Sequence, residues 1–208
     1  MFTGIITKTC PVTAVKMDRS LCRYAVALDG ELLTGLKTRA SVSIDGTCLT
    51  VTAIDSTGVW FDAISETLNK TTLNSLKVGD LVNVERAARF GDEIGGHLLS
   101  GHIFGTATVE KIVNENGTYV LYFKCPPAWC KYLLPKGYVA IHGASLTLVD
   151  VDGTKGIFSV HLIPETLKLT NLGQKKVGDR VNIELDSSTQ AIVDTVERYL
   201  SQTMMSTS

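Results

Sequence analysis

The sequence contains no apolar run that approaches the roughly 18 to 20 residues needed to cross a bilayer. Its opening segment, MFTGIITKTC, lacks the charged start, the long apolar stretch and the cleavage pattern of a secretory signal. These absences argue against a membrane-spanning or secreted protein. We therefore expect a cytoplasmic protein.

Neither sign of charge is in excess, since the 208 residues carry a formal net charge of −1. Proteins that bind nucleic acids or anionic membranes usually carry a basic surface, so neither is an expected partner. The five cysteines form no CxxC pair, which argues against a disulfide framework and against a zinc site. GxGxxG and GxxxxGKS/T segments are also missing, which argues against dinucleotide folds and P-loop enzymes. We therefore expect reduced thiols and no metal.

What the sequence does contain is a long internal repeat. The segment IDGTCLTV at residues 44–51 returns 97 positions later as IHGASLTL at residues 141–148. After two additional residues in the second copy, KVGDLVNVE at 77–85 corresponds to KVGDRVNIE at 176–184. An ETL triplet lies between these segments in both copies. Because order and spacing are both kept, the chain is one module duplicated.

The amino terminus belongs to the repeat as well, because FTGII at residues 2–6 aligns with LSGHI at 99–103. The polar, glycine-containing segment RFGDEIGG at 89–96 has the composition of a linker between compact units. Two copies are too few for a stacked solenoid, so each copy should close its own core. We therefore predict a first domain at residues 1–96 and a second at residues 97–186.

Strand patterns dominate each copy. ASVSIDGTCLTVTAI alternates apolar and polar residues around a glycine, and GVWFDAI is rich in aromatic and branched residues. Short segments of this kind at near-regular spacing favour a small antiparallel barrel, whose closure removes exposed strand edges. SETLNKTTLNSL and PETLKLTNLG predict a strand end that leads into a helical turn, with Ser65 or Thr67 as a cap and Pro164 as a stiff start.

The final segment has no second copy. DSSTQAIVDTVERYLSQTMM begins with capping residues and predicts a helix with Ile192, Val196, Tyr199 and Leu200 on one face. An apolar stripe that has no partner helix in its own chain is most simply buried against the same helix of other chains. We predict that residues 187–208 form an oligomerisation helix and tail.

The repeated phrase places small polar residues on one surface. Cys48 and Thr50 in the first copy, and Ser145 and Thr147 in the second, are two positions apart in a strand and therefore share a face. For a single residue of this kind, hydrogen bonding to neighbouring backbone is the commoner explanation. Core packing, however, gives no special reason to keep the polar side chains, the ETL triplet and the glycine together through a duplication. We favour a repeated ligand site, whose apolar walls and few hydroxyls suit a flat heteroaromatic molecule with polar edges.

Six segments, MFTGII, GTCLTV, GGHLLSGHI, GASLTL, HLIPETL and AIVDTVERYL, together resemble the alpha chain of the riboflavin synthase family, in the same order and over essentially the whole length. The resemblance implies an all-β fold of two six-stranded antiparallel Greek-key barrels followed by a C-terminal α-helix. It also implies a cytosolic homotrimer in which every barrel binds one 6,7-dimethyl-8-ribityllumazine. Two lumazines then exchange a four-carbon unit without a cofactor, which yields riboflavin and 5-amino-6-ribitylaminouracil. The implied active site lies where the first barrel of one chain faces the second barrel of its neighbour.

A dismutation gives unequal roles to identical molecules, so the two half-sites should differ where protons and nucleophiles are handled. Aligned pairs that differ include Cys48 and Ser145, Ile5 and His102, and Asp62 and His161. His102 is the expected base for a proton of the lumazine 7-methyl group, because an imidazole titrates near neutrality. Cys48 and Ser145, with Thr147 beside the latter, are the candidates for the nucleophile or for holding the water that adds to the other ring. Since Cys48 and His102 belong to opposite copies, we expect them to meet in a composite pocket formed by two chains.

By the resemblance, the substrate-contacting residues are Gly4, Ile5, Ile6, Ser41, Cys48, Leu49, Thr50, Asp62, Ala63, Ile64, Ser65, Glu66, Thr67, Gly101, His102, Ile103, Lys136, Ser145, Leu146, Thr147, His161, Leu162, Ile163, Pro164, Glu165 and Thr166. For Glu66 and Glu165, stabilisation of a helix start is an equally good explanation. His97 lies five residues before His102 without a third ligand pattern, so we expect a structural role and not a metal site.

Two other functions remain open. A noncatalytic antenna protein that binds lumazine or flavin would share the fold, but in such relatives the second half tends to lose its ligand motif. GASLT and HLIPETL keep that motif here. A flavin-dependent reductase on a similar barrel would need a nicotinamide domain, and the sequence has no Rossmann-type segment. Both observations favour the enzyme.

Overall fold

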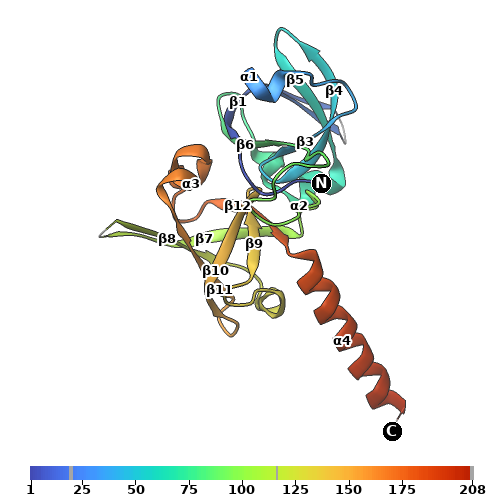
Figure 1. Ribbon diagram of the computed structural model, residues 1–208, viewed down its shortest axis with the longest axis vertical. Coiled ribbons are helices and arrows are strands. Elements are labelled where there is room, and N and C mark those ends of the chain that lie inside the picture. The colour runs from blue at the N-terminus through green and yellow to red at the C-terminus, as the bar shows by residue number, and fades with distance from the viewer. Residues whose placement is uncertain (19–20, 116, 207–208) are drawn as a thin grey trace.

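Alternating apolar and polar residues build two closed barrels in the computed structural model, which describes residues 1–18, 21–115 and 117–206 (Figure 1). The first barrel contains β1 (Lys8–Asp18), β2 (Leu21–Val26), β3 (Ser41–Ile44), β4 (Thr47–Asp55), β5 (Gly58–Ile64) and β6 (Leu81–Arg86). The strands neighbour one another in the order β1-β2-β5-β4-β3-β6, and β6 pairs back onto β1. Because β2 pairs with β5 and not with β3, the connections follow a Greek key.

The second barrel repeats this plan. It contains β7 (Gly105–Glu115), β8 (Thr118–Lys124), β9 (Tyr138–Ile141), β10 (Ala144–Asp152), β11 (Ile157–Leu162) and β12 (Arg180–Leu185). Its neighbour order is β10-β11-β8-β7-β12-β9 around a closed ring. Started at β7 and followed the other way round, this order is β7-β8-β11-β10-β9-β12, in which every strand is the counterpart of one in the first barrel. The predicted fold of two six-stranded antiparallel barrels from a duplication is confirmed.

Short helices occupy equivalent places in the two copies. Helix α2 (Ser65–Lys70) and the 3-10 turn η1 (Thr72–Ser75) follow β5, while α3 (Pro164–Leu169) and η3 (Asn171–Gln174) follow β11. Two further elements, α1 (Gly30–Leu33) and η2 (Pro127–Tyr132), are not predicted by the sequence, since such short segments carry no helical periodicity. The predicted terminal helix is present as α4 (Ser187–Ser206), which projects away from both barrels (Figure 1).

The helical turns begin differently from the prediction. Pro164 does occupy the first turn of α3, but neither Ser65 nor Thr67 caps α2, because the residue at the cap position is Ile64, whose side chain makes no capping bond. The capping hydroxyl lies one helix later, where Thr71 accepts a hydrogen bond at the start of η1, as its counterpart does in η3.

Within the described residues, the helices lack the combined length and apolarity that a bilayer crossing requires.

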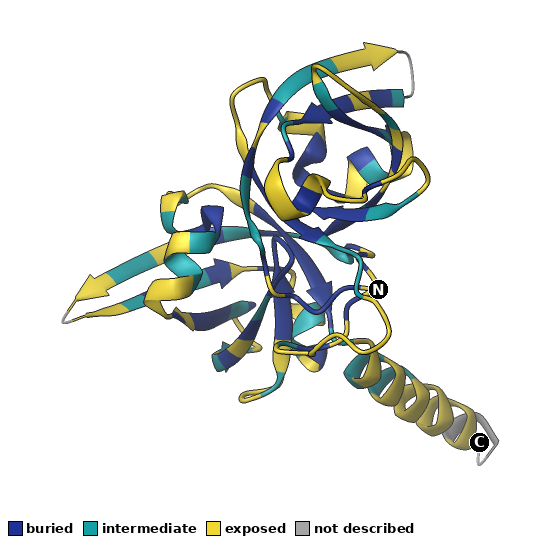
Figure 2. Cartoon of the chain, turned by 45° about the horizontal axis from the view of Figure 1, so that its top comes forward, coloured by how far each residue is buried: buried dark blue, intermediate teal, exposed yellow. Residues whose placement is uncertain are grey.

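Each barrel encloses its own core, visible as the buried inner faces of the strands in Figure 2. Phe61 lies in the first core, and Phe123 and Phe158 stack in the second with ring centroids 5.3 Å apart. One residue departs from this division. Ile6 precedes β1 of the first barrel, yet its side chain packs in the core of the second. The amino-terminal segment therefore crosses from one barrel to the other.

The barrels meet at the hairpin turns that carry the repeated glycines. Asp45 and Gly46 between β3 and β4 have φ values of 45° and 82°, and His142 and Gly143 repeat the pattern with 47° and 82°. Two successive residues with positive φ form a type I′ hairpin turn. A Cβ at Gly46 would lie 2.6 Å from the Gly143 nitrogen, so the two turns touch where only glycine fits.

Buried amides join the two turns reciprocally. Asn83 donates its side-chain amide to the carbonyl of His142 at 2.9 Å, and Asn182 donates to the carbonyl of Asp45 at 2.8 Å. The side-chain oxygens of the two asparagines accept backbone N–H groups from η3 and η1 of the opposite copy, at 2.7 Å and 2.8 Å. Buried amides are costly without such partners, so these bonds fix the two barrels in an approximately two-fold arrangement.

His142 should make this junction sensitive to acid. Burial lowers its pKa from the usual 6.5 to about 4, although the carboxylate of Asp45, 3.9 Å away, acts in the opposite direction. The unfolded chain therefore binds this proton more readily than the native one. As pH falls from about 6.5 to about 4, the free energy of unfolding should fall by about 3 kcal/mol in total. Denaturant unfolding at a series of pH values measures this change.

A variant separates His142 from the other titrating groups. His142→Asn keeps a residue that tolerates positive φ and removes the imidazole, so it should flatten the pH dependence. The exposed His161, replaced by asparagine, serves as the control and should leave the slope unchanged. If His142→Asn and wild type lost stability in parallel, the imidazole would not be the group responsible.

Candidate functional site

The small polar residues of the repeated phrase lie on the outer faces of the barrels. On β4, Cys48 and Thr50 alternate with the buried Leu49 and Val51. On β10, the same alternation places the corresponding serine and threonine outside. The predicted shared face is therefore confirmed in both copies.

Segments from opposite copies cross over to cover these faces. The amide of Cys48 donates to the carbonyl of Gly101 at 2.9 Å, so the start of the second copy lies on β4 of the first barrel. Reciprocally, the amide of Ser145 donates to the carbonyl of Gly4 at 2.9 Å, so the start of the first copy lies on β10 of the second barrel. The two segments also pair with each other through Phe2 and Leu99, whose backbones exchange bonds of 2.8 Å and 3.0 Å. Nothing in the sequence pattern predicts that the start of each copy lies on the barrel of the other copy.

The first-barrel pocket lies between β4, the start of α2 and the segment before β7. It is a cavity of about 290 Å³, and its lining includes Cys48, Glu66, Thr67, Gly101, His102 and Ile103. All six belong to the predicted contact residues. The carboxylate of Glu66 is paired with Lys70 at 3.1 Å and stands in the first turn of α2, so it faces both the helix start and the pocket.

The second-barrel pocket is the counterpart in the other copy. Its cavity of about 160 Å³ lies between β10, the start of α3 and the amino-terminal segment, and its lining includes Gly4, Ile5, Ile6, Ser145, Ile163, Glu165 and Thr166. These residues also belong to the predicted set. Both pockets thus combine one strand from one copy with a short segment from the other.

One expectation about the site is wrong. Cys48 and His102 line the same pocket of a single chain, whereas the sequence suggested that two chains are needed to bring them together. The physical reason is the crossing of residues 99–103 onto the first barrel. Ile5, which aligns with His102, lies correspondingly in the second-barrel pocket.

Two glycines set how closely the crossing segments approach the strands. Gly4 and Gly101 have φ values of 76° and 78°. A Cβ at Gly4 would lie 2.5 Å from the Cβ of Ser145, and a Cβ at Gly101 would lie 2.5 Å from the Cβ of Cys48. No other residue type fits both the backbone conformation and the space. The candidate nucleophiles are therefore held in direct contact with the covering backbone.

His97 lies beside the second-barrel pocket, where the sequence suggested only a structural role. Its Nδ1 is 2.6 Å from the hydroxyl of Ser145, and its ring stacks on Tyr138 with centroids 5.0 Å apart. Burial lowers the pKa of His97, and Asp186 acts in the opposite direction. A neutral imidazole at this distance can accept the serine proton. The sequence hides this pairing, because the partner hydroxyl lies 48 positions away on β10.

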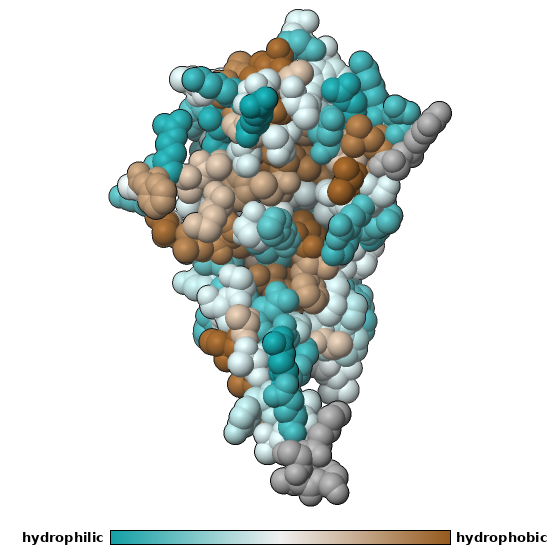
Figure 3. Space-filling model, turned by 90° about the vertical axis from the view of Figure 1, so that its right-hand side faces the viewer, coloured by the Kyte–Doolittle hydropathy of each residue, from teal (hydrophilic) through white to brown (hydrophobic). Residues whose placement is uncertain are grey.

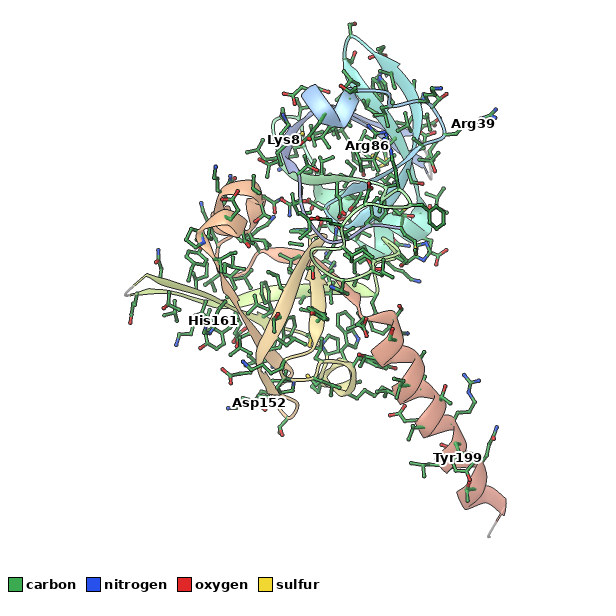
Figure 4. All side chains as sticks on the ribbon, in the orientation of Figure 1. Lys8, Arg39, Arg86, Asp152, His161 and Tyr199 are labelled. Carbon is green, nitrogen blue, oxygen red and sulfur yellow. The ribbon has the colours of Figure 1, made fainter. Side chains whose placement is uncertain are left out.

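Other predicted residues lie on the same outer faces beyond the pockets. Thr50 pairs with Ser41 across β4 and β3. Asp62 stands on β5 in an ion pair with Arg23 at 3.0 Å. His161 occupies the corresponding position on β11, exposed on the second barrel (Figure 4). These residues lie on the outer faces but do not line the two pockets, which are lined by Cys48 and Ser145 of the repeated segments.

Several predicted contact residues point away from solvent. The side chains of Leu49, Ala63, Leu146 and Leu162 are buried in the barrel cores, so only their main chains can reach a ligand. Lys136 has a φ of 69° and its amide donates to the carbonyl of Leu148, which places it at the edge of β10.

Within the described part of the chain, no group of three or more His, Cys, Asp and Glu side chains is placed to hold a metal ion.

Comparison with known proteins gives a consistent result. The model of the lumazine binding domain matches this chain twice, at residues 3–87 and 100–186. A riboflavin synthase of Escherichia coli strain K12 is 52% identical over 96% of this chain and 93% of its own length. A riboflavin synthase of Chlamydia pneumoniae is 46% identical over 96% of this chain and 97% of its own.

Solved structures resemble the chain as well. A crystal structure of LumP complexed with riboflavin has a TM-score of 0.82 and 28% identity, covering 90% of this chain and all of the other. LumP complexed with 6,7-dimethyl-8-(1′-D-ribityl) lumazine has a TM-score of 0.79 and 29% identity, covering 88% and 98%.

Proposed function

The chain belongs to the lumazine-binding family, and from this premise we propose how its two pockets carry out the reaction of its riboflavin synthase relatives. Those relatives match it over nearly the full length, so the chain is an enzyme of the last step of riboflavin biosynthesis. The observation that supports catalysis over mere binding is that both copies keep a complete pocket, each with a candidate nucleophile and the start of a helix.

The proposed substrates are two molecules of 6,7-dimethyl-8-ribityllumazine, one in each kind of pocket. Transfer of a four-carbon unit between them gives riboflavin and 5-amino-6-ribitylaminouracil. His102, exposed in the first-barrel pocket, takes a proton from the 7-methyl group, and an acid or base in such a position typically contributes about 10² to 10⁴ in rate. Ser145 with His97 in the second-barrel pocket, or Cys48 reaching across from the facing first-barrel pocket, supplies the nucleophile or holds the water that adds to the second ring. Thr147 stands on the same face of β10 beside Ser145.

The pairing of pockets requires more than one chain in this proposal. The two linings share no residue, and each pocket is covered by a different crossing segment. Two ligands of one chain therefore occupy separate sites, whereas the reaction needs them face to face. We propose a homotrimer in which the first-barrel pocket of one protomer faces the second-barrel pocket of the next. Hydrophobic side chains exposed on the side toward which α4 projects provide surface for such contacts (Figure 3).

The same proposal assigns a role to each part of the chain. Residues 1–96 form the first lumazine-binding domain, residues 97–186 the second, and residues 187–208 the oligomerisation helix and tail, of which 207–208 lie outside the described residues. The separate cores of the two barrels support this division. The crossing segments mean that each domain also completes the pocket of the other.

The test of the proposed function is incubation of the purified protein with the lumazine alone. One riboflavin should form for every two lumazines consumed, with no addition of metal or nicotinamide. Bound lumazine that is never converted would instead support the antenna function. A strict requirement for metal or nicotinamide would contradict the cofactor-free reaction.

Removal of α4 should separate assembly from binding. Ile192, Val196, Tyr199 and Leu200 are 65%, 51%, 68% and 51% exposed, and Tyr199 points into solvent far from the barrels (Figure 4). If these side chains pack between protomers, a chain that ends at residue 186 should have a lower mass in light scattering. It should still bind lumazine but form riboflavin at least about tenfold more slowly, because paired pockets are lost.

A point variant tests the same stripe without removing the contacts of α4 with its own barrel. Val196→Glu places a charge in the stripe and leaves the bond between Asp194 and Tyr132 intact. Arg198→Glu, on another face of the helix, serves as the control. An unchanged mass for Val196→Glu would contradict the proposed seam.

A further inference from the structure

Two buried carboxylates occupy equivalent places in the two copies and have no part in the chemistry described above. Glu85 ends the segment KVGDLVNVE on β6, and Glu184 ends KVGDRVNIE on β12. Each is only 5% exposed. A buried carboxylate is costly unless donors surround it, so the partners of these two groups indicate what they are for.

Each carboxylate is surrounded by one crossing segment. Glu184 accepts from the amide and hydroxyl of Ser100 at 2.7 Å and 2.8 Å, and from the amide of Gly101 at 3.1 Å. Glu85 accepts from the amide and hydroxyl of Thr3 at 2.6 Å and 2.8 Å, and from the amide of Gly4 at 3.1 Å. Burial raises the pKa of both groups, while these hydrogen bonds act in the opposite direction. Bonds from N–H and O–H donors to a charged acceptor are stronger than neutral ones, so both segments are firmly tied.

The bonds continue into the pockets. The Ser100 hydroxyl that donates to Glu184 also accepts from the amide of His102 at 3.1 Å. The carbonyl of Gly101, the next residue bound by Glu184, accepts from the amide of Cys48. One carboxylate thus fixes both the candidate base and the backbone that covers the candidate nucleophile. In the other copy, the hydroxyl of Thr3 accepts from the amide of Ile5 at 3.4 Å.

We propose, on the basis of the proposed function, that Glu184 and Glu85 are positioning residues and that each acts on the pocket of the other barrel. Glu184 belongs to the second barrel and places His102 in the first-barrel pocket. Glu85 belongs to the first barrel and places Ile5 in the second-barrel pocket. The consequences of losing them differ in degree. Glu184 places the base His102 and the backbone over Cys48, whereas Glu85 places the apolar Ile5 and the backbone over Ser145. Loss of Glu184 therefore lowers kcat more than loss of Glu85 does, and loss of Glu85 also raises KM.

The test compares Glu184→Gln, Glu85→Gln and a control, Glu110→Gln, which alters an exposed residue of β7. Glutamine keeps the shape but presents an N–H group to donors that need an acceptor. With 6,7-dimethyl-8-ribityllumazine as substrate, Glu184→Gln should lower kcat by about 10-fold to 100-fold, the cost of a misplaced catalytic group. Glu85→Gln should raise KM and lower kcat by less than Glu184→Gln does, and the control should match wild type. Thermal unfolding of each variant identifies any loss of fold.

A double-mutant cycle separates positioning from general structural support. If Glu184 acts through His102, then Glu184→Gln should change kcat by less than about threefold in a His102→Ala background. Full additivity of the two substitutions, or a wild-type kcat for Glu184→Gln, would overturn the inference. Should Glu184→Gln fail to fold, Ser100→Ala takes its place in the same cycle, because it removes the hydroxyl that links Glu184 to His102. A wild-type protein that forms no riboflavin would contradict the proposed function, whereas additivity in an active protein would contradict only the role of Glu184.

Discussion

Riboflavin formation should fall by about 100-fold or more when Gly101 is replaced by alanine. The added Cβ would lie 2.5 Å from the Cβ and 2.9 Å from the nitrogen of Cys48, so the crossing segment must move away from β4. That movement breaks the bond from the amide of Cys48 to the carbonyl of Gly101 and carries His102 out of the pocket. Steady-state rates with lumazine measure the loss.

Gly117→Ala is the matched control for this variant. Gly117 has a φ of 77°, nearly that of Gly101, but nothing lies within 4 Å of the position its Cβ would occupy. It therefore carries the same backbone penalty of about 1 to 2 kcal/mol without the collision. Comparable activity of Gly101→Ala and Gly117→Ala would show that the close approach at Cys48 has no role in catalysis.

If the chain forms the proposed trimer, mixed assemblies should recover activity when each protomer carries a lesion in a different pocket. Gly101→Ala blocks the first-barrel pocket and leaves the second intact, while Gly4→Ala collides with Ser145 and does the reverse. After subunit exchange, some neighbouring protomers pair two intact pockets. In a random equal mixture, about one quarter of the sites should be restored to full activity, far above either variant alone.

The pairing of variants decides what this experiment can show. His102→Ala mixed with Cys48→Ala should not recover, because both residues line the first-barrel pocket of one chain. This second mixture is therefore the negative control. If the Gly4→Ala and Gly101→Ala mixture gave no more riboflavin than the sum of its parts, with exchange verified by mass, the site would lie within one chain.

The strands and the terminal helix are predictable because their signals are local. The alternation around Cys48 places that residue outside and Leu49 inside, and the structure keeps both assignments. The stripe from Ile192 to Leu200 likewise predicts a helix, which the structure has as α4. Apolar residues that recur every two residues in a strand, or every 3.6 residues in a helix, can be recognised without knowledge of the rest of the chain.

The pockets are only partly predictable, because their walls come from distant parts of the chain. The family resemblance places Ser145 and Gly4 in the contact set, but no local pattern brings residues 141 positions apart together. His97 is missed for the same reason, since its partner hydroxyl belongs to β10. In the sequence, Asn83 and Asn182 look like ordinary polar residues of two strands. Their hydrogen bonds to the turns of the opposite copy depend on a junction that forms only when both barrels are folded. Local propensity carries no information about such long-range contacts.

The crossing of the two segments constrains how this duplicated chain can change over generations. A substitution on the outer face of β4 meets residues 99–103, which are encoded in the other half of the gene, and β10 meets the start of the chain in the same way. The halves therefore cannot drift apart as two independent copies. The unit on which selection acts is a strand from one half together with the segment from the other, and covariation between positions 48 and 101, and between 4 and 145, should exceed covariation between aligned positions of the repeat.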